Sequence, residues 1–196
     1  MPGIGLRYGV VATLNSHTKG TEPTYNAGMV ACEMIQANLT ITRNSNPLYA
    51  DDTISEDDNS ITAMSLEVTG NDLTEAVRCY MLGLKKVTTG SGDTAVDTYY
   101  DTDAAAPYVG FGYIRVKTLK GVKSYEGIWI YKAMFAEENE NSATKGESIE
   151  WQTPTITGRC MGVSIDSTGD LTFRKKRYFD SEGDAMTWLN GLAGIS

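Results

Sequence analysis

The chain has 196 residues, of which 41% are hydrophobic and 21% are charged, a composition typical of one globular domain. Its 25 acidic and 17 basic residues give a formal charge of −8, which disfavours tight binding to a polyanion such as DNA. We recognise neither an export signal nor an apolar stretch long enough to span a membrane, and we therefore expect a soluble protein.

Cysteine usage points to a reducing compartment. The three cysteines, Cys32, Cys79 and Cys160, are an odd number and form no C-x-x-C pair. Neither a disulfide framework nor a zinc site is therefore expected. Each lies in an apolar or alternating stretch, which predicts small buried thiols.

Three strands are predicted in the first half of the chain, over residues 5–14, 33–42 and 61–69. The second and third alternate with a period of two, so each has one apolar and one polar side and is expected to be half-buried. A polar loop is expected over 15–24. The polar sides of the second and third strands carry Gln36, Asn38, Thr40, Thr42, Ser65, Glu67 and Thr69.

The connection over residues 44–60 is much longer than an ordinary hairpin loop. It contains the apolar residues Pro47, Leu48 and Tyr49, which indicate an adhesive segment, while a mobile solvated loop is the alternative. Its acidic residues are Asp51, Asp52, Glu56, Asp57 and Asp58.

A helix is predicted over 72–82. Asp72 and Glu75 have the spacing of a capping box, and Gly83 is a typical helix end. The stretch 88–106 is rich in Gly, Thr, Asp and Ala and is expected to be a long exposed loop.

The second half of the chain predicts a hairpin of strands 108–119 and 125–135 with a turn at Lys120 and Gly121. Further strands are expected over 148–163 and 171–175, and a second helix over 181–192. We predict a single domain over 1–196 that is mainly β, either a sandwich or a partial barrel, with these two helices.

No catalytic centre is expected. His17 is the only histidine and has no recognisable orienting partner in sequence. The acidic run 51–58 lacks the ligand spacing and the glycine of an EF-hand loop, and the G-x-G pairs lack the rest of a phosphate-binding motif. We therefore expect no catalytic residues, no metal and no cofactor.

A dense basic cluster is formed by Arg174, Lys175, Lys176 and Arg177. It is expected at a strand end, with its charges facing solvent or the acidic segment of a neighbouring copy.

Several segments together resemble the major tail proteins of siphophages, the tail tube subunits common in phages of Gram-positive bacteria. The resemblance runs through most of the chain and rests on the order and spacing of its segments, with the helix over 72–82 among them. The other segments are Gly-Leu-Arg-Tyr at 5–8, Asn-Pro-Leu-Tyr-Ala-Asp-Asp at 46–52, Gly-Phe-Gly-Tyr-Ile-Arg at 110–115, the hairpin return at 127–135 and Thr-Pro-Thr-Ile-Thr-Gly at 153–158.

The resemblance implies a structural virion protein that assembles as stacked hexameric rings, each subunit adding four strands to a large barrel. The implied partners are further copies of the chain, the tape measure protein and the tail terminator and distal tail proteins. Double-stranded DNA would pass through the lumen without tight binding, and no membrane is involved. The expected location is the virion tail, and the host cytoplasm during assembly.

Within that family, the polar sides of the strands at 33–42 and 61–69 would face the lumen. Contacts between subunits or rings would involve Leu48 and Tyr49, the five acidic residues of 51–58, and the basic cluster at 174–177.

Two alternatives from other classes remain. Eleven tyrosines and three tryptophans would also suit a β-sandwich that binds cell-surface carbohydrate. The tryptophans Trp129, Trp151 and Trp188 lie in strand or helix patterns, which favours core packing over an exposed platform. An enzyme with an unusual carboxylate site, using Asp51 or Glu56, is the weaker alternative.

Overall fold

The computed structural model describes residues 2–50, 53–92, 95–101, 105–137 and 153–195. These residues are mainly β with antiparallel sheets and two helices, which confirms the predicted fold class at that level. The strands of the largest sheet are β1 (Gly3–Ser16), β2 (Thr24–Cys32), β3 (Met34–Arg43), β6 (Ile61–Gly70), β9 (Val109–Leu119), β10 (Val122–Glu137), β11 (Thr155–Cys160) and β12 (Arg174–Phe179). Their order is β2-β1-β9-β10-β11-β6-β3, and β12 pairs with β10 beside this path.

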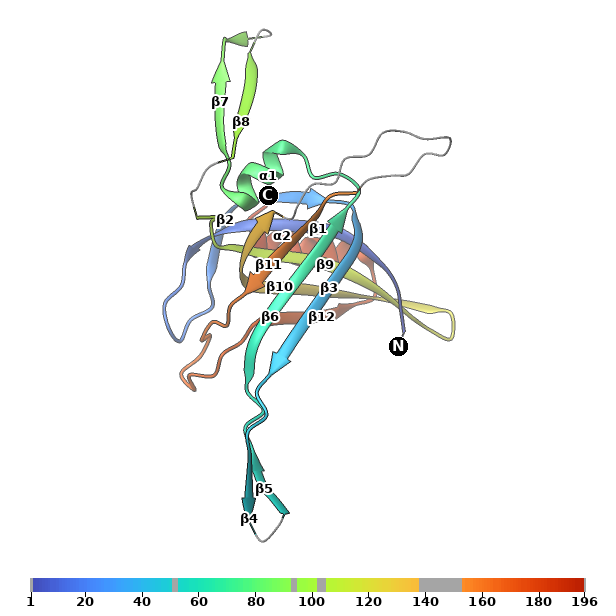
Figure 1. Ribbon diagram of the computed structural model, residues 1–196. Coiled ribbons are helices and arrows are strands. Elements are labelled where there is room, and N and C mark those ends of the chain that lie inside the picture. The colour runs from blue at the N-terminus through green and yellow to red at the C-terminus, as the bar shows by residue number, and fades with distance from the viewer. Residues whose placement is uncertain (1, 51–52, 93–94, 102–104, 138–152, 196) are drawn as a thin grey trace, which may run out of the picture.

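Strand β10 is where the sheet changes direction. Its first part pairs with β12 and its last part pairs with β11. Between Ile130 and Ala133 its register to β9 shifts, and both residues face the same core. Such an irregularity bends a strand and changes which side chains face inward. As a result β3, β6 and β11 lie across β1 and β9, as Figure 1 shows.

Two hydrophobic clusters fill the two sides of the strand system. The first lies between the crossing strands and α1 (Glu75–Leu82), and includes Leu66 and Phe111. The second lies beneath α2 (Glu182–Ala193) and includes Trp129 and Leu189. Glycine at position 112 makes the second cluster possible, because a Cβ there would lie 2.7 Å from Cε3 of Trp129 and 2.8 Å from Cδ2 of Leu189.

Both predicted helices and the predicted hairpin are present. The turn residues between β9 and β10, Lys120 and Gly121, both have positive φ, as a two-residue hairpin turn requires. Gly83 and Gly194 end the helices in the left-handed conformation. The expected capping box is wrong in detail: Thr74, rather than Asp72, caps α1, since its side chain accepts the Val77 N–H.

Of the three expected loops, the one over 15–24 is largely present between β1 and β2, but the other two are largely wrong, because each contains a two-stranded hairpin. Residues 44–60 include β4 (Pro47–Ala50) and β5 (Thr53–Asp57), here called the β4–β5 arm. The pair β7 (Lys85–Thr89) and β8 (Val96–Tyr100) occupies much of the second segment and forms the β7–β8 arm. Figure 1 shows the two arms projecting at opposite ends of the body.

Three further strand predictions need correction. Strand β2 was not expected, since half-exposed and exposed positions along most of its length give no regular apolar side. The strand expected over 148–163 is β11 alone, and residues 148–152 lie outside the described residues. The strand expected over 171–175 begins only at Arg174 and continues to Phe179.

Candidate functional site

The seven polar residues predicted on two strands share one face of the sheet. Strands β3 and β6 are antiparallel neighbours, and their register places the polar residues of one strand opposite those of the other. The pairs are Gln36 with Thr69, Asn38 with Glu67, and Thr40 with Ser65, while Thr42 lies opposite Ala63. All four β3 members are exposed, Ser65 and Glu67 are half-buried, and Thr69 is buried. We call these seven residues the polar face.

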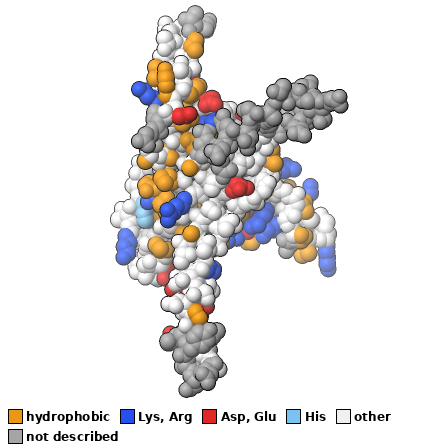
Figure 2. Space-filling model, in the orientation of Figure 1, with side chains coloured by type: hydrophobic (Ala, Val, Ile, Leu, Met, Phe, Trp, Pro, Cys, Tyr) orange, Lys and Arg blue, Asp and Glu red, His pale blue; other side chains and the backbone are white. Residues whose placement is uncertain are grey.

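Hydrogen bonds between side chains tie the polar face together. The Asn38 amide Nδ2 donates to Glu67 Oε1 at 2.9 Å. At the edge toward β11, the hydroxyls of Thr69 and Thr155 are 2.9 Å apart. These are contacts between small polar groups, and in Figure 2 the region over β3 and β6 is mainly white, the colour of uncharged polar side chains and backbone.

The polar face continues onto β11, which sequence reasoning did not include. Thr157 lies opposite Glu67, and Arg159 lies opposite Ser65. Arg159 is exposed. The seven predicted residues contain no lysine or arginine. Arg159 shows, however, that the face to which they belong also includes a cation. The alternation of Thr155, Thr157 and Arg159 in the sequence was the signal that could have found it.

The β4–β5 arm carries the predicted contact residues, and the structure describes only part of them. Leu48 and Tyr49 belong to β4, but their side chains lie outside the described residues, as do Asp51 and Asp52 altogether. Of the acidic residues, Glu56, Asp57 and Asp58 are described and exposed.

Neutral groups hold the carboxylates at the base of this arm. Asp57 Oδ1 accepts the Asn46 N–H at 2.9 Å. Asp58 accepts from the Asn44 amide at 2.8 Å and from the Ser60 N–H at 3.1 Å. These two hydrogen bonds hold the pKa of Asp58 below its ordinary value. The base of the arm therefore keeps negative charge at its surface.

The basic cluster at 174–177 does not form one patch, because successive side chains of a strand point to opposite faces. Lys175 is on the α2 side, where its Nζ is 2.8 Å from Glu22 Oε1. Arg177 is on the same side, with its guanidinium 5.3 Å from the Phe179 ring centroid. Arg174 and Lys176 point to the other face. Lys176 and Arg177 are exposed, while Arg174 and Lys175 are half-buried, so only part of the cluster faces solvent as expected.

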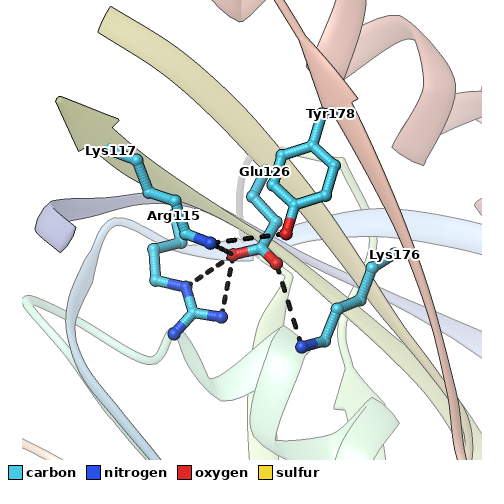
Figure 3. A network of polar contacts seen from close by, with 5 residues as sticks. All are labelled: Arg115, Lys117, Glu126, Lys176 and Tyr178. Carbon is cyan, nitrogen blue, oxygen red and sulfur yellow. Dashed lines mark hydrogen bonds and ion pairs between the residues drawn. The ribbon is translucent and has the colours of Figure 1, made fainter. Parts of the chain in front are cut away.

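A buried carboxylate organises that other face, as Figure 3 shows. Arg115 donates from Nε and approaches with Nη2, both at 2.8 Å from Glu126 Oε2, and Lys117 Nζ is 2.9 Å from the same oxygen. Lys176 Nζ lies 3.8 Å from Oε1. Tyr178 completes the group, with its hydroxyl 3.5 Å from Lys117 Nζ. We call these five residues the Glu126 cluster.

The sheet register explains how this cluster forms. Arg115 on β9 and Tyr178 on β12 both lie opposite Glu126 on β10. Only 1% of the Glu126 side chain is exposed, which would disfavour its charged form without partners. Burial raises the pKa of Glu126, but Lys117 and Arg115 outweigh it and leave this pKa below its ordinary value. Glu126 is therefore ionised at neutral pH.

Two of the three cysteines lie in surroundings that keep their thiols protonated. Burial raises the pKa of the Cys32 thiol to about 11 and that of Cys160 to about 12, so both are protonated thiols at neutral pH. Cys79 is half-buried rather than buried as predicted, and all three cysteines are free. His17 Nε2 lies 3.4 Å from the Ser164 carbonyl.

Neither a metal site nor a membrane helix is seen in the described part of the chain. No group of three or more His, Cys, Asp or Glu residues there could hold a metal ion. None of its helices is both long and apolar enough to span a bilayer.

Of the tryptophans, Trp129 is fully buried and Trp188 packs against Phe179, while Trp151 lies outside the described residues.

No protein-family model matches the chain, and no curated protein matches it in sequence. The resemblance to tail tube proteins therefore stays a prediction. Its support comes from the surfaces described above.

Proposed function

We propose that this protein is a structural, non-enzymatic subunit of a hollow tube, the major tail tube protein of a siphophage. Copies assemble as hexameric rings, and the rings stack into the tube through which the genome leaves the virion. The observation that supports this proposal best is the polar face: a layer of strands with a buried apolar side and an exposed side of small, mainly uncharged groups.

The architecture of this layer suits a wall shared by several copies. Strands β3, β6 and β11 and the last part of β10 lie side by side, and β3 is the last strand of the sheet order. An edge strand offers unpaired backbone groups to another strand, and closing the sheet into a barrel removes that exposed edge. Four strands from each of six copies would close such a barrel.

The size of that barrel agrees with duplex DNA. About 24 strands spaced roughly 4.8 Å apart and tilted about 40° give a backbone diameter near 48 Å. Side chains on both walls remove roughly 10 Å, which leaves room for a hydrated duplex.

The chemistry of the polar face suits passage rather than binding. Duplex DNA carries about one charge per 1.7 Å of axis, and a wall rich in lysine and arginine would hold it by releasing counterions. Glu67 and Arg159 are charges of opposite sign on this face, and Lys132, two residues before the Arg159 partner Met134 on β10, adds one cation on the same side. A wall of this kind lets DNA slide.

Electron microscopy of the purified protein, stained and at high concentration, tests the proposal. We expect rings or tubes, either spontaneously or after adding the nucleating components of the same virion. A protein that stays dispersed under all these conditions would not be a tube subunit.

The β4–β5 arm provides the contact between rings or subunits in this proposal. The double variant Leu48→Ala/Tyr49→Ala removes its two apolar anchors and should leave a folded monomer that does not polymerise. Circular dichroism checks the fold and light scattering checks assembly. Normal tubes from this variant would mean that the arm does not form the contact between copies.

A further inference from the structure

The Glu126 cluster contains more positive charge than its single carboxylate neutralises. Arg115, Lys117 and Lys176 surround one carboxylate, and Arg174 is the next residue along β12 on the same face. Among the described residues, Glu126 is the carboxylate within ion-pair distance of these groups. Burial lowers the pKa of Lys176 most, and the nearby Arg174 lowers this pKa further. The cluster therefore favours an additional anion.

An apolar surface borders these cations on the same face. Leu119 and Val122 are register partners at the end of the β9–β10 hairpin, two positions beyond Lys117 on the strand. Leu119 is 50% exposed, Val122 is 65% exposed and Tyr178 is 61% exposed. With a strand rise of about 3.4 Å per residue, Arg115 to Leu119 spans about 14 Å. Such a strip fits an acidic segment of a partner protein.

The chain itself supplies an acidic segment of the required kind. Glu56, Asp57 and Asp58 are exposed at the base of the β4–β5 arm, and no cation in the described part of the chain forms an ion pair with them. Figure 1 shows this arm extending away from the body, so a neighbouring copy could reach it without any change in the fold. In Figure 2, one group of blue side chains lies on the side of the white polar region that is toward the β9–β10 turn.

We propose that the Glu126 cluster, with Leu119 and Val122, is the docking site for the acidic base of the β4–β5 arm of a second copy. This inference rests on the proposed function, since it assigns the receptor that the arm meets when rings or subunits associate. Glu126 does not itself bind the partner. It holds Arg115, which is 37% exposed, and Lys117, which is 16% exposed, in fixed positions, and this lowers the cost of ordering them on binding.

Charge reversal tests this inference. Lys176→Glu in the cluster and Asp57→Lys in the arm should each raise the protein concentration needed for assembly about tenfold, the effect of losing about 1.4 kcal/mol at an interface. A single chain that carries both changes restores an opposite-charge pair. Its assembly should return to within about twofold of the unmodified protein. Light scattering and electron microscopy measure assembly, and thermal unfolding checks that each monomer is folded.

Matched controls separate the proposed contact from a general effect of charge. Lys123→Glu places the same charge change on β10 but on the opposite face, and Asp101→Lys matches the arm variant elsewhere on the surface. Both should assemble normally. Lys176→Gln removes the cation without adding a second acid beside Glu126, and it should impair assembly less than Lys176→Glu but in the same direction.

The outcomes distinguish this inference from the function on which it rests. If the unmodified protein forms tubes and the single reversals do so at the same concentration, the docking site is wrong and the proposed function stands. The same conclusion follows if the double variant shows no recovery. If the unmodified protein never forms tubes, the proposed function fails as well. Binding of duplex DNA that Lys176→Glu abolishes, with assembly unchanged, would assign the cluster to nucleic acid instead.

Discussion

Two polar surfaces on the same strand system, the polar face and the Glu126 cluster, differ in how they distribute charge. On the polar face, Asn38 and Glu67 meet at an exposed position through one hydrogen bond, and the neighbours are hydroxyls and amides. In the Glu126 cluster, a carboxylate with a 1% exposed side chain is held by cations on two neighbouring strands. The first surface spreads little charge over a wide area, and the second concentrates charge at one point.

This difference follows from where each surface lies relative to the hydrophobic core. The polar face covers the outer side of strands whose inner side is buried, so water solvates its side chains and each contact contributes little. Glu126 lies next to the core on strand β10, where its neighbour Ile128 is fully buried. Ion pairs there are costly to break, because the partners would be left without compensation.

The largest effect is expected from Glu126→Gln. This change keeps the shape of the side chain but removes the charge that Arg115 and Lys117 share. We expect the free energy of unfolding to fall by about 2 to 3 kcal/mol, measured by urea denaturation of the monomer. Arg7→Gln, which breaks the exposed Arg7–Glu182 pair, is the control and should cost less than about 1 kcal/mol. Equal effects of the two variants would mean that the buried Glu126 cluster stabilises the fold no more than an exposed ion pair does.

Acid provides a second test of the cluster. The pKa of Glu126 is lowered in the folded protein, so its contribution to stability is complete above the unfolded value of about 4.3 and is lost as the pH falls through the folded value. The unmodified protein should therefore lose more stability than Glu126→Gln between about pH 6 and pH 3. Other carboxylates with lowered pKa, such as Asp58, contribute to both proteins and cancel in the difference. Parallel stability curves would contradict the ionised state of Glu126.

Sequence alone predicted the polar face but not the Glu126 cluster, and strand register explains why. Alternation along residues 33–42 and 61–69 identifies a polar side on each strand, and joining them requires only that the two strands be neighbours. The cluster joins three strands, and Lys176 lies 50 residues beyond Glu126 in the chain. Part of it was nevertheless within reach. The two-residue turn at Lys120 and Gly121 fixes the hairpin register, and counting back from it places Arg115 opposite Glu126.

The two arms were missed for a different reason. Both are two-stranded and project from the body. In the β7–β8 arm no described strand position is buried, so no buried side imposes a period-two pattern of apolar residues there. In β8, for example, Val96 and Tyr100 are both exposed. Composition then favours a loop, although the backbone forms a hairpin.

Adding cations to the polar face should alter function more than stability. The double variant Ser65→Lys/Glu67→Lys changes half-buried positions on an outer surface and places a lysine opposite Arg159, and we expect the free energy of unfolding to fall by about 1 kcal/mol at most. In assembled virions, however, genome release should slow or stall, because each ring then presents many more phosphate-binding groups. Thr187→Lys on α2 is the control away from this face. Unchanged release kinetics in the double variant would contradict the assignment of this face to the lumen.

The smallest effect is expected from Asn38→Ala. The Asn38 side chain is exposed and its amide donates one hydrogen bond to Glu67, so water replaces the lost partner and the free energy of unfolding should fall by less than about 0.5 kcal/mol. The variant should also assemble normally, because a surface that lets DNA slide does not depend on any single contact. A loss above about 1 kcal/mol in the monomer would mean that the polar face is packed against another part of the protein instead of facing water. A normal monomer that fails to assemble would place Asn38 at a contact between copies, and the lumen would then have to be sought on another face.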